Sequence, residues 1–146
     1  MSTGRVSTFD HALQVANTWV HDVAREFDTE DRQFAYRALR AWLHTLRDRL
    51  TVEAAAHFAA QLPDLLRGIY YEGWNPSAVP AKYDAQAYAA RFAREATISV
   101  QDVPRAAAAT TAAALHHLPA TQVEKVLDQL PKDIRQLLRP QPRAEA

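Results

Sequence analysis

Four basic side chains recur at the spacing of one helix face. They are Arg37, Arg40, His44 and Arg47. Steps of three, four and three residues place them on one side of a helix, opposite an apolar face of the same segment. With no acidic residue among them, this basic stripe could contact phosphates or an acidic protein partner. The alternative is an ordinary solvated face whose arginines pair with acids on neighbouring helices.

A second group of candidates lies where aromatic residues gather with glycine and proline, between residues 65 and 83. The candidate binding residues there are Arg67, Tyr70, Tyr71, Glu72 and Trp74. Aromatic side chains at such a joint mostly pack, and burial there favours a structural role. The functional alternative is a ligand pocket at the joint, for which Glu72 and Arg67 would supply polar groups. Such a pocket requires roughly 300 Å³ or more.

Metal-binding and catalytic patterns do not emerge from the remaining polar residues. Glu53 and His57 share a helix face, which predicts an exposed side-chain pair. The sequence has neither the paired Glu-x-x-His of a di-iron bundle nor a His-Glu-x-x-His motif. There is no cysteine, and no serine lies in a Gly-x-Ser-x-Gly turn. We therefore predict no metal, no cofactor and no enzymatic activity.

Length and charge restrict the remaining possibilities. The chain has 146 residues, which predicts one domain. Its 17 basic and 17 acidic residues cancel, so no overall field draws it to nucleic acid, which is not an expected partner. No apolar run reaches the roughly 18 residues that span a bilayer. Without cysteines or an apolar leader at the N-terminus, the expected location is the cytoplasm, away from membranes.

Helical periodicity runs through nearly the whole sequence and predicts about eight helices. They cover approximately residues 8–27, 30–50, 51–62, 63–70, 82–96, 99–118, 119–130 and 131–139. Thr8, Thr29 and Thr51 are predicted to cap the first three helices. Gly68 and Gly73 are expected to end a helix at the joint, and the prolines that follow stop another from forming there.

The two halves of the sequence resemble each other. Gln-Leu-Pro occurs at Gln61–Pro63 and again at Gln129–Pro131, 68 positions later (129 − 61), with apolar positions in register around it. We predict an all-α fold of two tandem four-helix units, residues 9–71 and 83–139, related by an approximate twofold axis. Residues 65–83 form the joint between them. The Pro-rich end, residues 140–146, is expected to be disordered.

One long segment carries a family resemblance. The stretch "RALRAWLHTLRDRLTVEAAAHFAAQLPDLLRGIYYEGWNPS" resembles the domain-of-unknown-function 2267 family in its "RDRL", "QLP" and "YYEGW" elements. The similarity extends from about Phe9 to Arg139. It implies an all-helical bacterial protein with an internal duplication, and it implies no reaction. The second half departs from the pattern, because "AAAATTAAAL" replaces the Arg- and Trp-containing "RALRAWLHTL".

These observations favour a non-catalytic helical interaction or regulatory protein. The expected surface combines the basic stripe with the exposed edge of the joint, and the expected partner is a protein. Self-association into a dimer is an open alternative. A small-molecule carrier or sensor with a pocket at the joint is the second hypothesis. Nucleic-acid binding through the stripe is the third and is less favoured.

Overall fold

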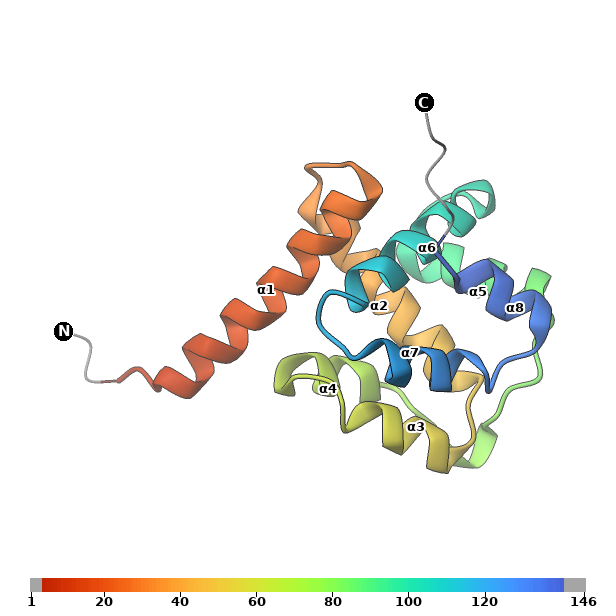
Figure 1. Cartoon of the computed structure of the whole chain (residues 1–146), viewed down its shortest axis with the longest axis horizontal. Coiled ribbons are helices and arrows are strands. Elements are labelled where there is room, and N and C mark those ends of the chain that lie inside the picture. Colours follow the sequence, from red (N-terminus) through yellow and green to blue (C-terminus); the bar gives the residue numbers. More distant parts are fainter. Residues whose placement is uncertain (1–3, 141–146) are drawn as a thin grey trace.

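The computed structural model describes residues 4–140 and contains helices joined by short loops (Figure 1). The helices are α1 (Ser7–Phe27), α2 (Arg32–Asp48), α3 (Val52–Ala59), α4 (Asp64–Tyr71), α5 (Ala85–Ala96), α6 (Val103–Ala114), α7 (Ala120–Leu127) and α8 (Lys132–Leu138), with single 3₁₀ turns η1 (Pro76–Ala78) and η2 (Val100–Asp102). No strand occurs in this part of the chain. The all-α prediction is confirmed. No helix among the described residues is long and apolar enough to cross a membrane.

Helix α2 is the centre of the fold. It packs against α1, α4, α5 and α6, and it contributes large buried side chains, including Leu39, Trp42 and Leu46. Helix α6 is instead rich in buried alanine and threonine. Because small side chains let helix axes approach closely, α6 leaves room for the bulky residues of α2.

Side chains cap the beginnings of α2, α3 and α5, whereas α1, α4, α6, α7 and α8 begin without a side-chain cap. Thr51 accepts a hydrogen bond from Ala54 N, as predicted for the start of α3. The Thr29 prediction is wrong: Asp31 caps α2 by accepting from Phe34 N, while Thr29 Oγ1 accepts from Asp31 N ahead of the helix. The Thr8 prediction is also wrong, since Thr8 lies inside α1.

The joint, residues 65–83, includes most of α4 and the segment that leads from its end to α5. Gly73 has φ +77°, a left-handed conformation that glycine adopts without strain. Gly68 does not end a helix, because it lies within α4. Ala81 N donates a hydrogen bond of 2.7 Å to Asp48 O, which fixes the joint to the end of α2.

The helix boundaries repeat along the chain. Helices α7 and α8 begin 68 residues after α3 and α4 respectively, which is the spacing of the Gln-Leu-Pro repeat. The approximate twofold relation between the two halves stays a prediction. Apart from Pro140, the predicted disordered tail lies outside the described residues.

Candidate functional site

Half of the basic stripe of α2 is buried and the other half, Arg37 and Arg40, is only partly exposed, which corrects the expectation of an exposed surface. His44 and Arg47 are buried, with 5% and 4% of their surface exposed. Arg37 Nε donates to Ala96 O at 2.9 Å. The stripe points into the space between α2, α4 and α5, where backbone carbonyls and carboxylates satisfy its donors. Spacing alone could not distinguish this arrangement from a solvated stripe.

Arg47 fastens the end of α4 to α2. Its Nη1 donates to Tyr70 O at 2.8 Å and to Glu72 O at 2.6 Å, which are carbonyls at a helix end that lack intrahelical partners. Its Nε donates to Asp48 Oδ1 at 2.8 Å, and Arg91 reaches the other oxygen of that carboxylate. This network links three helices and engages both Nε and Nη1 of Arg47 within the protein.

The remaining members of the stripe are also paired. His44 Nδ1 is hydrogen-bonded to Glu95, and its Nε2 lies 2.7 Å from Ile69 O. Arg40 is hydrogen-bonded to Glu72 and lies 3.4 Å from Glu95. This hydrogen bond lowers the pKa of the Glu72 carboxyl below its ordinary value. The stripe therefore serves to attach the joint and α5 to α2.

The aromatic residues of the joint form a continuous packed series. Ring centroids lie 6.0 Å apart for Trp42–Phe58, 5.9 Å for Phe58–Tyr70 and 5.3 Å for both Tyr70–Tyr71 and Tyr71–Trp74. Tyr70 is fully buried, and its hydroxyl donates to Ala55 O. These contacts agree with the structural interpretation of the joint.

The remaining joint candidate, Arg67, lies apart from this series. Its guanidinium donates to Ala59 O and Leu62 O at the end of α3. Arg67 therefore satisfies carbonyls at the end of that helix.

Two buried tyrosines should make the fold sensitive to alkali. Burial raises the pKa of Tyr70 and Tyr88 well above the ordinary value of about 10. Since the folded pKa lies above the unfolded one, their contribution to the free energy of unfolding is complete below about pH 10 and is lost as pH rises further. Absorbance titration should show that two of the five tyrosines ionise only together with loss of helical circular dichroism. Ionisation of all five in the folded protein would contradict this.

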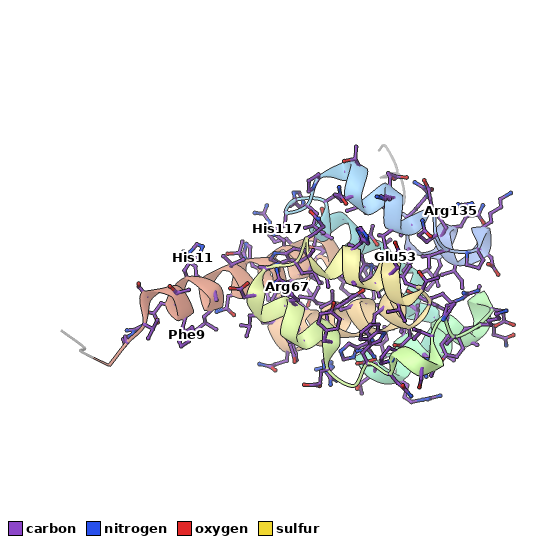
Figure 2. All side chains as sticks on the ribbon, turned by 90° about the horizontal axis from the view of Figure 1, so that it is seen from below. Phe9, His11, Glu53, Arg67, His117 and Arg135 are labelled. Atoms are coloured by element: carbon purple, nitrogen blue, oxygen red, sulfur yellow. The ribbon has the colours of Figure 1, made fainter. Side chains whose placement is uncertain are left out.

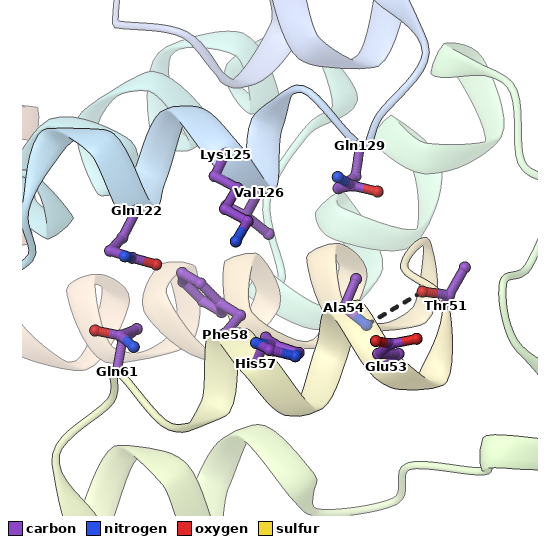
Figure 3. A pocket seen from close by; sticks show the side chains of 10 residues that line it. All are labelled: Thr51, Glu53, Ala54, His57, Phe58, Gln61, Gln122, Lys125, Val126 and Gln129. Atoms are coloured by element: carbon purple, nitrogen blue, oxygen red, sulfur yellow. Dashed lines mark hydrogen bonds between the residues drawn. The ribbon is translucent and has the colours of Figure 1, made fainter.

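A groove lies between α3 and α7 (Figure 3). Its volume is about 500 Å³. The lining residues are Thr51, Glu53, Ala54, His57, Phe58 and Gln61 from α3 and its flanks, and Gln122, Lys125, Val126 and Gln129 from α7 and its end. Phe58 and Val126 form a nearly closed apolar floor, since only 4% and 5% of their surfaces are exposed.

The polar side chains of this groove differ from those of the stripe in having no partner. The side chains in question are Glu53, His57, Gln61, Gln122, Lys125 and Gln129. None of them makes a hydrogen bond or ion pair with any other residue between 4 and 140. Figure 3 shows Lys125 reaching from α7 toward α3. Six unpaired polar groups therefore line one concavity, where a ligand could satisfy them.

The repeat in the sequence contains a signal for this groove. At the repeat spacing of 68, Phe58 corresponds to Val126 and His57 to Lys125, and the structure brings these residues to the same groove. Helical spacing by itself predicts only an exposed Glu53–His57 pair on one helix. Pairing equivalent positions of the repeat would have identified the groove, had the packing of α3 against α7 been known.

The histidines do not assemble a metal site in the described part of the chain. No group of three or more His, Asp or Glu side chains there is placed to hold an ion. His117, labelled in Figure 2, instead stacks on Trp19 with centroids 4.7 Å apart, and its Nε2 lies 2.7 Å from Asp22 Oδ2. This contact joins the end of α6 to α1.

Comparison with protein-family models identifies the family of this chain. The model of a family described as "Uncharacterized conserved protein (DUF2267)" matches residues 16–137. No curated protein matches the chain. The matched region includes the central helix, the aromatic series and the groove.

Proposed function

Since the chain belongs to the DUF2267 family, whose description names no activity, we propose from its geometry that it is a non-catalytic binding protein. Its ligand is an extended segment of a protein partner that carries a carboxylate and lies in the groove between α3 and α7. The observation that carries the proposal is the set of six unpaired polar side chains in this groove. The groove's hydroxyl residue, Thr51, is engaged in capping α3.

Three primary amides make the groove suitable for a peptide backbone. Each of Gln61, Gln122 and Gln129 can both donate and accept hydrogen bonds. An extended backbone presents N–H and C=O groups in alternation, and all of them need partners when water is excluded. Gln122 lies near the Gln61 end of the groove and Gln129 near the Thr51 end (Figure 3), so the amides are distributed along its length.

The charges of the groove define the ligand further. Lys125 offers an ammonium to a carboxylate, and His57 adds a ring nitrogen on the opposite wall. Glu53 lies toward the Thr51 end and would accept a donor from the same segment. Ala54 is half-buried beside the floor residues and would contact a small apolar side chain of the ligand. The expected ligand therefore combines one acidic group with one apolar group.

A titration with a defined peptide tests this function. We expect the blocked tripeptide acetyl-Ala-Leu-Asp-amide to shift ¹⁵N resonances of α3 and α7, and acetyl-Ala-Leu-Asn-amide to bind more weakly. Lys125→Ala should weaken binding of the acidic peptide about tenfold or more, because it removes a charge-assisted hydrogen bond.

The matched control for this titration is Lys132→Ala, an exposed lysine on α8, which should leave the affinity unchanged. Shifts located away from α3 and α7, or equal losses for the two lysine variants, would refute the proposal.

A small-molecule carrier is the second candidate, favoured by one observation. The groove volume of about 500 Å³ lies within the range of small-molecule sites, about 300–1,000 Å³. The site thus moves from the aromatic joint, where packing fills the space, to the groove. A native mass spectrum separates the two candidates, because a resident small molecule adds stoichiometric mass whereas the peptide proposal expects the bare chain.

The proposal also covers the cellular compartment and the class of partner. The absence of cysteine suits a reducing compartment such as the cytoplasm. Nucleic acid is not part of the proposal, because the arginines of the stripe already hold carbonyls and carboxylates within the protein.

A further inference from the structure

The ionisable side chains of the α3–α7 groove are arranged unevenly along its length. Glu53 and His57 lie four residues apart on α3, and Lys125 reaches toward α3 from the opposite wall (Figure 3). Glu53 lies toward the Thr51 end of the groove, whereas the opposite end is lined by glutamine amides. Among the described residues that line the groove, only Glu53 is acidic. The groove therefore carries a negative charge near one end and a positive charge beside it.

The position of Glu53 on its helix accounts for only part of what this residue offers. Glu53 lies in the first turn of α3, where the helix dipole favours a carboxylate. The cap of this helix is nevertheless Thr51, which accepts the hydrogen bond from Ala54 N. The Glu53 side chain is exposed and makes no hydrogen bond or ion pair with any residue between 4 and 140. Its carboxylate oxygens are therefore available to a bound ligand.

The spacing of the charges on α3 matches that of side chains on an extended segment. Residues four apart on a helix have Cβ atoms about 5–6 Å apart. Residues two apart on a strand share one face and lie about 6.6 Å apart. A segment that runs along the groove would thus place one side chain beside Glu53 and the next but one beside His57 and Lys125. The side chain between these two points the other way, toward the floor of Phe58 and Val126.

We propose that the groove selects an extended segment in which an acidic and a basic side chain flank one apolar residue. The basic side chain pairs with Glu53, the acidic one pairs with Lys125, and the apolar residue lies on the floor between them. This inference rests on the proposed function, to which it adds the basic residue and its spacing. Because the two ends of the groove differ in charge, the segment lies with its basic residue toward the Thr51 end.

A double-mutant cycle between the protein and a peptide tests the pairing with Glu53. The affinities of acetyl-Lys-Leu-Asp-amide and acetyl-Gln-Leu-Asp-amide are measured by ¹⁵N NMR titration, with the wild-type chain and with Glu53→Gln. We expect wild type to bind the lysine peptide about three- to fivefold more tightly, as for a solvent-exposed ion pair, and Glu53→Gln to lose this preference. An extended segment can enter the groove in either chain direction, so the reversed peptides are titrated in the same way. One of the two directions should show the coupling.

Two controls separate the spacing of the charges from net charge. Acetyl-Leu-Lys-Asp-amide has the composition and net charge of the first peptide, but its charged side chains are adjacent and point to opposite faces of an extended segment. Glu53→Gln should therefore leave its affinity unchanged. Glu30→Gln makes the same change in net charge at an exposed residue in the loop before α2, and it should keep the preference for the lysine peptide.

The outcomes distinguish failure of this inference from failure of the proposed function. If the peptides bind through Lys125 but neither direction shows coupling to Glu53, the pairing is refuted and the proposed function stands. If the adjacent-charge peptide couples to Glu53 as strongly as the spaced one, the proposed spacing is refuted. If no acidic peptide shifts resonances of α3 and α7, both proposals are refuted. Circular dichroism of Glu53→Gln should show the helical content of wild type.

Discussion

Replacing Arg47 with alanine is expected to lower the free energy of unfolding by about 3–5 kcal/mol. The substitution leaves the carbonyls of Tyr70 and Glu72 without their donor. It also removes one of the two arginine partners of Asp48, a carboxylate that is 13% exposed. Because desolvated acceptors and charges without partners are costly, the loss should far exceed that of an ordinary surface arginine. Urea denaturation followed by circular dichroism measures it.

Two variants give this experiment its comparison. Arg94→Ala removes an exposed arginine from α5, and its effect should lie within about 0.5 kcal/mol. Arg47→Lys keeps the positive charge but loses the planar guanidinium with its several donors. Its free energy of unfolding should therefore lie between those of the wild type and Arg47→Ala. If Arg47→Ala were as harmless as Arg94→Ala, the stripe would be a surface after all, and the interaction hypothesis based on it would regain its site.

Trp42→Ala should cost a similar amount, about 3–5 kcal/mol, for a different reason. Trp42 is fully buried at the centre of α2, contacts the Phe58 ring and donates from Nε1 to Thr111 Oγ1 at 2.9 Å. The small side chains of α6 cannot expand to fill the space, so a cavity remains. Chemical denaturation with a tryptophan-independent probe is required, because the mutation removes a fluorophore.

Trp74→Ala is the internal control for this prediction. Trp74 is half-buried at the end of the aromatic series, and its ring nitrogen has no hydrogen-bond partner among the described residues. Its loss should be clearly smaller, on the order of 1 kcal/mol. Equal effects at Trp42 and Trp74 would mean that the joint matters as much to the core as α2 does.

The sequence predicted the helices well because their cause is local. Apolar spacing identified the segments, and capping by Thr51 was read correctly from residue type and position. The neighbouring cap was missed because Thr29 and Asp31 can both accept a backbone hydrogen bond. Which of two capping residues begins the helix depends on the conformation of the loop before it. The local sequence pattern does not determine that conformation.

The candidate site was harder to predict because its causes are not local. A helix face of arginines looks the same in sequence whether water or another helix lies against it. Arg47 is buried because four helices surround α2, and that number follows from topology. Likewise, His57 and Lys125 are far apart in the sequence, and only the packing of α3 against α7 makes them walls of one groove.

The size difference between α2 and α6 has a consequence for how the chain folds. Helix α1 packs on α6, and α5 packs on α2, so each half of the chain covers the central helix of the other. Trp42 comes from the first half, and Thr111, which accepts its hydrogen bond, comes from the second. Neither half holds a complete core, because the large core side chains come from α2 in the first half and the small side chains that accommodate them come from α6 in the second half. Each half therefore needs the other in order to fold. If the chain were cut within the joint, each fragment would fold only in contact with the other fragment. During synthesis, the first half would fold only after the second half had been made.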